Sequence, residues 1–423
     1  MKPFDSNQVR CEAIVYSPAM HPKNDRPAIS PLRALLPEEH ALWRLGFRPF
    51  YLFGATFAAV SIPLWIAQYL GWAPGLENVN LLWHMHEMVF GFAVAIVIGF
   101  LYTAARNWTG LWTPRSGHLA ALLLLWLAGR GAMLFAPPLW AAVIDLAFLP
   151  FAAWPIYRIL RSSGNKRNYF LVGLLGLLTL TNVMFHAAVN GWPLFSPVTA
   201  VYAAILIIVI IESVIAARVI PMFTKNGAPG VTPVVRPRLD KICLALIVAA
   251  SISYLSGLPA VLVSSLALAA SAAQLWRLYG WQSHRTAAYP LLWILHVSYA
   301  WIPLGFILIA LSAFQLVPAS AAFHALTVGS MAGLIIGMMT RTSLGHTGRM
   351  LTSGWSELVM YLSIQAGAVL RVAAALGPPI GMRDDVRAGM LASAALCWSV
   401  AFLLFIAVYG RYLLRPRLDG REG

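Results

Sequence analysis

Four histidines in apolar surroundings are the residues of this sequence best suited to chemistry. His84 and His86 stand on either side of Met85, and His186 and His324 lie in two other apolar runs. A neutral imidazole is a good ligand for haem iron and for copper. The four histidines therefore predict a haem or metal site, and hydrogen-bonded structural imidazoles are the alternative.

The spacing of His84 and His86 limits how the two can act. Residues two apart on a continuous helix differ by about 200° around its axis, so these side chains would point to nearly opposite sides and serve two centres. If the first turn is unwound, both could bind one copper ion. Met85, Met88 and Met184 offer thioethers that suit Cu(I), although methionine is more often core filler.

A second group of polar residues carries His296 and His346. His346 belongs to a run of clustered polar side chains at residues 338–349, which could bind a second metal ion or haem propionates; a solvated loop is an equal alternative. Four arginines are candidate clamps for haem propionates: Arg106, Arg218, Arg341 and Arg349. For Arg218 the alternative is a side chain that extends from the helix end to the membrane surface.

Carboxylates inside apolar runs are costly and mark functional candidates. Glu87 follows the histidine pair, and Glu212 has no local partner, so both are candidate proton relays. Arg130 and Asp145 fall at similar depth in consecutive apolar runs, which predicts a structural ion pair.

The elements that must position these residues follow from the composition. Of the 423 residues, 60% are hydrophobic and 11% charged, against about 25% charged in soluble domains, so a soluble enzyme is excluded. Runs of about 20 apolar residues are long enough to cross a bilayer as helices. The sequence predicts an all-α bundle of twelve transmembrane helices over residues 48–70, 84–105, 117–136, 139–160, 168–190, 197–222, 240–257, 259–279, 290–314, 321–341, 355–376 and 387–413.

The net charge of +15 is explained by topology, with no nucleic acid as partner. Lys and Arg fall in alternate connections, and the positive-inside rule then places both termini in the cytoplasm. This puts His84, His86, His186 and His324 near the outer surface, and His296 and His346 near the cytoplasm. Residues 1–46 form a polar cytoplasmic arm, 47–414 the membrane domain and 415–423 a basic tail. Gly329, Gly333 and Gly337 favour close helix packing.

Three motifs show a resemblance to a known family. WHMHEMVFGF at residues 83–92, followed by NWTG at 107–110, resembles the NnrS family of bacterial membrane proteins. GMMTRTSLGHTGR at 337–349 is similar to its second hallmark, and RLGFRPF at 44–50 fits the start of that family. The similarity runs from about residue 40 to the last helix.

The resemblance implies a haem- and copper-containing protein of the bacterial inner membrane, associated with nitric oxide metabolism, nitrosative stress and denitrification. Haem b would pair His84 or His86 with His186 or His324, and copper would lie near the remaining outer histidines. Redox chemistry would need an electron donor. The alternative is a secondary transporter of a small solute, and a haem–copper oxidase relative is more distant because no adjacent His-His pair occurs.

Overall fold

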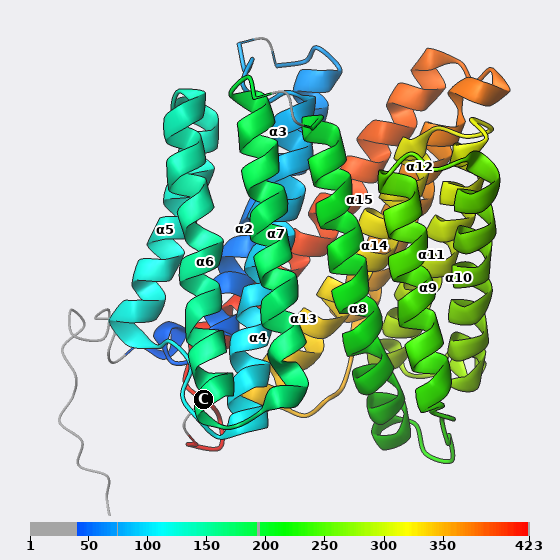
Figure 1. Cartoon of the computed structure of the whole chain (residues 1–423). Coiled ribbons are helices and arrows are strands. Elements are labelled where there is room, and N and C mark those ends of the chain that lie inside the picture. Colours follow the sequence, from blue (N-terminus) through cyan, green and yellow to red (C-terminus); the bar gives the residue numbers. More distant parts are fainter. Residues whose placement is uncertain (1–39, 74, 193–194, 422–423) are drawn as a thin grey trace, which may run out of the picture.

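The computed structural model describes residues 40–73, 75–192 and 195–421, and this part of the chain forms twelve long helical passes and no strand (Figure 1). The predicted all-α, twelve-helix fold is confirmed. Ten passes are single helices: α2 (Phe47–Tyr69), α5 (Ser116–Phe135), α6 (Pro138–Ser162), α7 (Tyr169–Val189), α8 (Pro197–Gly227), α9 (Pro237–Leu255), α10 (Ala260–Gly280), α11 (Pro290–Ala313), α14 (Trp355–Leu376) and α15 (Asp384–Leu413). Two passes join three segments each: α3 (Leu81–His86), η2 (Glu87–Ala93) and α4 (Val94–Thr109); and α12 (Ala319–His324), η5 (Ala325–Ala332) and α13 (Gly333–His346).

Eleven of these passes are long and apolar enough to cross a membrane. The twelfth, α9, has Arg238, Asp240 and Lys241 in its first turns, which lowers the apolar content of its 19 residues. Residues 1–39 of the predicted N-terminal arm lie outside the described residues.

The predicted breaks at the two proline-containing connections are confirmed. α5 ends at Phe135 before α6 begins at Pro138, and α9 ends at Leu255 before α10 begins at Ala260. Proline is tolerated at the first position of a helix, because the N–H group that it lacks would have no hydrogen-bond partner within the helix. α8 extends five residues beyond its predicted end, past the internal Pro221, and thereby adds Phe223 and Thr224 to the helix.

Both composite passes widen into a π-helix directly after a histidine. The segment η2 follows His86 and η5 follows His324. A π-turn leaves backbone groups without their usual partners, and such turns occur often at functional sites. In η2 the carbonyl of Gly91 accepts a hydrogen bond from Trp126 Nε1 at 2.9 Å.

The glycine stripe in η5 and α13 packs against α11, as predicted. A Cβ atom on Gly329 would lie 2.3 Å from the Trp301 ring, and one on Gly333 would lie 2.2 Å from Ser298 Oγ. Both contacts are too short for any side chain, so glycine permits this approach of the two helices.

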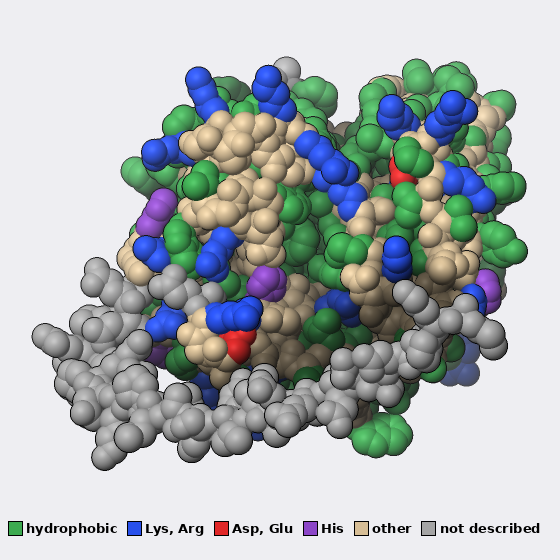
Figure 2. Space-filling model, turned by 90° about the horizontal axis from the view of Figure 1, so that it is seen from below, with side chains coloured by type: hydrophobic (Ala, Val, Ile, Leu, Met, Phe, Trp, Pro, Cys, Tyr) green, Lys and Arg blue, Asp and Glu red, His purple; other side chains and the backbone are tan. Residues whose placement is uncertain are grey.

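Positive charge gathers at one end of the bundle. We call this end the basic face; it is where α4, α6, α8, α10, α13 and α15 end, and Figure 2 shows many Lys and Arg side chains on it with few Asp or Glu. Both ends of the described chain meet here, because Arg48 at the start of α2 donates hydrogen bonds at 2.8 Å to the carbonyls of Leu413 and Arg415. We call the other end of the bundle the opposite face.

Candidate functional site

His84 and His86, which both lie in α3, point to different neighbours. The first turn of α3 is helical rather than unwound, and the Asn80 side chain caps it by accepting a hydrogen bond from Trp83 N at 3.0 Å. His84 meets His324 of α12, whereas His86 meets His186 of α7. The four histidines are thus divided into two pairs, one on each side of α3.

His84 and His324 line a cavity of about 490 Å³, which we call the His84 cavity. Their ring centres are 6.4 Å apart and their planes differ by 11°. The Trp65 ring is also stacked with His84, with centres 5.1 Å apart and planes within 7°. Sites for cofactors and drug-sized ligands have volumes of about 300–1,000 Å³, so this cavity is large enough for one.

The ring nitrogens of this pair are suited to binding a metal ion. His324 Nδ1 donates to the Ser320 carbonyl at 2.6 Å, which leaves Nε2 with its lone pair. Such a hydrogen bond fixes the tautomer of histidine ligands in metalloproteins. His84 Nδ1 is buried and has no hydrogen-bond partner. Ring centres 6.4 Å apart are compatible with two imidazoles that share one ion, each bound at about 2 Å.

The walls of the His84 cavity are apolar, with two cations among them. Met85, Met88 and Met331 contribute thioethers, and no Asp or Glu is among the lining residues that the structure describes. Arg371 of α14 and Arg387 of α15 are the two cations. Arg387 contacts Tyr69 Oη at 3.3 Å and Asp384 at 3.7 Å. An apolar cavity with arginines suits a flat apolar ligand that carries carboxylates.

Sequence reasoning did not select these two arginines. It placed the candidate clamps near the basic face, on the far side of the membrane from His84. The signal was present for Arg371, a charge inside the apolar run 355–376, but nothing local showed which histidine it would approach.

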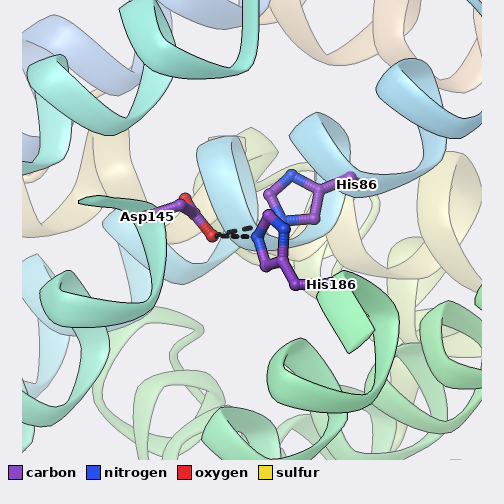
Figure 3. Close-up of side chains that lie close together, drawn as sticks. All are labelled: His86, Asp145 and His186. Carbon is purple, nitrogen blue, oxygen red and sulfur yellow. Dashed lines mark hydrogen bonds and ion pairs between the residues drawn. The ribbon is translucent and has the colours of Figure 1, made fainter. Parts of the chain in front are cut away.

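On the other side of α3, His86 belongs to a fully buried polar cluster that we call the His86 cluster (Figure 3). His86 Nε2 lies 3.2 Å from Asp145 Oδ2, and His186 Nε2 lies 3.1 Å from the same oxygen. One ligand atom from each of these three residues lies within 4.8 Å of the others, so the group could hold a metal ion. These three residues come from α3, α6 and α7, respectively.

Further hydrogen bonds orient the donors of the His86 cluster. His86 Nδ1 pairs with Glu87 Oε1 at 2.9 Å, which leaves Nε2 directed at Asp145. Asn182 Nδ2 donates to Asp145 Oδ2 at 2.8 Å, while its Oδ1 lies 3.0 Å from His86 Nε2. A carboxylate bound to the second ring nitrogen of a histidine is a recurrent support for metal ligands. Asn182 lies four residues before His186, and this helical spacing was the signal that could have identified it.

Arg130 of α5 joins the two carboxylates of the His86 cluster. Its Nη1 donates to Glu87 Oε1 at 2.7 Å, and its Nη2 donates to Asp145 Oδ1. The predicted ion pair between Arg130 and Asp145 is therefore present, within a larger network than we expected. With ionised carboxylates and neutral imidazoles, the cluster carries one net negative charge. A cation in its centre would balance that charge.

Glu212, the other candidate proton relay, lies in the middle of α8. It accepts a hydrogen bond from Ser330 Oγ of η5 at 3.0 Å. Met331, the next residue of η5, lines the His84 cavity, whereas Glu212 and Ser330 are not among the described residues that line it.

The two histidines predicted near the basic face lie apart from each other. His296 is buried, with Nε2 2.9 Å from Thr224 Oγ1, and its Nδ1 has no hydrogen-bond partner. His346 lines a second cavity, of about 680 Å³, together with Arg341. We call it the Arg341 cavity.

The other three predicted clamps line neither cavity. The Arg106 guanidinium lies over the Trp112 ring at 3.4 Å, and Arg349 lies over Tyr412 at 3.8 Å. Arg218 Nη1 donates to Asn168 Oδ1 at 2.9 Å. The structure thus places these side chains at the basic end of the bundle, away from both histidine pairs.

Comparison with known families agrees with this architecture. The model of the NnrS protein family matches residues 41–417, so the chain belongs to this family. No curated protein matches the chain. The family match covers both composite passes and every residue of the two histidine pairs.

Proposed function

For this member of the NnrS family, we propose a haem- and copper-binding membrane protein that handles nitric oxide. Haem b is assigned to the His84 cavity and copper to the His86 cluster. The observation that carries the proposal is the division of four histidines into two pairs by a single helix, with only Met85 between His84 and His86.

The His84 cavity supports the haem assignment through its donors and its walls. His84 and His324 would hold the iron, since their ring centres are 6.4 Å apart and their nitrogens are available. Arg371 and Arg387 would bind the propionates, because guanidinium and carboxylate groups pair by two parallel hydrogen bonds. Among the described lining residues no carboxylate would repel them.

The His86 cluster supports the copper assignment through its charge and donor set. Two imidazole nitrogens and one carboxylate oxygen are a suitable set for copper, and a cation would balance the net negative charge. Glu87 and Asn182 would hold the ligands in place. Zinc accepts the same donors, so metal analysis decides between the two ions.

These two centres would supply the chemistry that the side chains lack, because ferrous haem and Cu(I) bind nitric oxide directly and exchange single electrons. The chain itself would provide an apolar approach, since nitric oxide is small and apolar and the His84 cavity is lined mostly by apolar side chains. Glu212 and Glu87 are the carboxylates we assign to proton transfer. An electron donor is the remaining partner.

We place the protein in the bacterial inner membrane with both termini in the cytoplasm. The support is the basic face, since Lys and Arg are retained on the cytoplasmic side of bacterial membrane proteins (Figure 2). The His84 cavity would then face the outer side of the membrane. In this orientation the bilayer surrounds the twelve passes.

The test is the haem and copper content of purified protein and of two single variants. Wild-type protein should show a haem spectrum and contain copper by elemental analysis. His324→Ala should lose haem and keep copper, because His324 contacts only the His84 cavity. His186→Ala should lose copper and keep haem, because His186 belongs to the His86 cluster.

A matched control is His118→Ala, which changes a histidine near the basic face that lies in neither site. It should retain both haem and copper. A colourless, metal-free wild-type protein that moves a small solute into vesicles would contradict the proposal and favour the transporter alternative.

A further inference from the structure

The Arg341 cavity lies at the basic face and is separate from both histidine pairs. It is enclosed by the last turn of α8, the first turn of α11, the last turns of α13 and the segment 351–353. Asn226, Ala288 and Leu351 at its rim are exposed, so ligands can reach it from that face.

Arg341 is the only charged side chain among the described residues that line this cavity, apart from His346 when protonated. Its side chain is 8% exposed, and no described carboxylate lies within ion-pair distance. The guanidinium stacks on the Phe223 ring at 3.9 Å, which leaves its N–H groups free for other partners. A buried cation without a counter-ion is costly, so the arrangement is suited to an anion supplied by a ligand.

Other groups in the cavity favour the same kind of ligand. Thr342 and Ser353 supply hydroxyl groups, and no described acidic residue lines the cavity. The first turn of α11 also lies in its wall, and the N-terminus of this 24-residue helix carries partial positive charge. A guanidinium, hydroxyls and a helix N-terminus are the groups that proteins use to bind phosphate.

From these observations we infer that the Arg341 cavity binds a phosphate group, with Arg341 as its principal ligand. The inference does not depend on the haem and copper proposal. The phosphate could belong to an anionic lipid of the adjacent leaflet or to a soluble phosphate compound, because both carry the same oxyanion. Leu291 and Leu292 in the cavity wall can accept an apolar part of either ligand.

The test measures phosphate binding to the full chain in two settings. In detergent, binding of inorganic phosphate is measured by calorimetry. In lipid nanodiscs, retention of phosphatidylglycerol against phosphatidylcholine is measured by native mass spectrometry. Binding in detergent identifies a soluble phosphate ligand, and selective retention of phosphatidylglycerol alone identifies a lipid headgroup; either supports the inference.

The variants assign the binding to Arg341. Arg341→Gln should weaken it at least about tenfold, because a charge-assisted pair is lost. Arg341→Lys should weaken it less, since it keeps the charge but not the forked geometry. Arg349→Gln is the control, because Arg349 lies in the same polar segment but packs on Tyr412 outside the cavity.

Two results would overturn the inference: no binding of either ligand to wild-type protein, or equal binding by wild type and Arg341→Gln. If Arg341→Gln does not fold, hydrogen exchange of wild-type protein replaces it. Phosphate or phosphatidylglycerol should then slow exchange in the segment 341–353, and unchanged exchange there counts against the site.

Discussion

Replacement of Arg130 by methionine should destabilise the protein strongly, because Arg130 pairs with two buried carboxylates. Its guanidinium pairs with Glu87 and Asp145, and all three side chains are at most 6% exposed. In the copper-free state Arg130→Met removes one positive charge from the His86 cluster and leaves Glu87 and Asp145 without that partner. Removing one partner of a buried ion pair costs about 3–5 kcal/mol, and we expect a loss of that size for Arg130→Met.

A second variant separates charge from packing. In Arg130→Met with Asp145→Asn, one carboxylate is also neutralised, so the loss of one positive charge is offset by the loss of one negative charge. The double variant should therefore be more stable than the sum of the two single effects predicts, with a coupling energy of about 0.5–3 kcal/mol.

The assay is the free energy of unfolding in a fixed detergent, measured with copper removed by a chelator. Arg383→Met is the control for loss of an arginine–carboxylate pair, because Arg383 and Asp385 are 79% and 63% exposed. Surface pairs contribute about 0–1 kcal/mol, so this variant should change little. If Arg130→Met is as stable as the control variant, the electrostatic account of the cluster is wrong.

Three further substitutions test other parts of the account. Gly91→Ala should lower copper content, because the added Cβ would lie 2.7 Å from Arg130 Nη1 and 2.9 Å from Glu87 Oε2; haem content should stay near wild type. Arg371→Gln should speed haem loss to apomyoglobin by about tenfold or more, since a charge-assisted bond to a propionate is lost; unchanged transfer would exclude Arg371 as a clamp. Glu212→Gln should preserve both cofactors and weaken the pH dependence of the haem midpoint potential, whereas an unaltered dependence would remove Glu212 from the proton path.

Most of the fold was predictable because membrane helices are determined by simple local properties. The length of each apolar run, the prolines between runs and the alternation of charged connections predicted all twelve passes. The π-helices after His86 and His324 were not predictable, because they depend on contacts between helices, such as the bond from Trp126 to the Gly91 carbonyl. The end of α8 was also missed, because the helix continues five residues beyond its predicted end at residue 222.

The sequence predicted at what depth along the helices the candidate site residues lie, but not which helices are neighbours in the bundle. Helical spacing indicated that His84 and His86 would point to nearly opposite sides if the first turn is helical, and topology placed four histidines in one layer. Which helices are neighbours is a property of the packed bundle, so Asn182 was overlooked. The same limit explains why candidate clamps were sought at the basic face, whereas Arg371 lines the His84 cavity.

The central claim is that opposite sides of one helix hold two different cofactors, and the most direct measurement compares His84→Ala with His86→Ala. Haem is quantified by its pyridine haemochrome and copper by elemental analysis, both per folded chain. The account predicts opposite losses: His84→Ala loses haem and keeps copper, and His86→Ala loses copper and keeps haem. Loss of the same cofactor from both variants, or full retention of both cofactors by both, would contradict it.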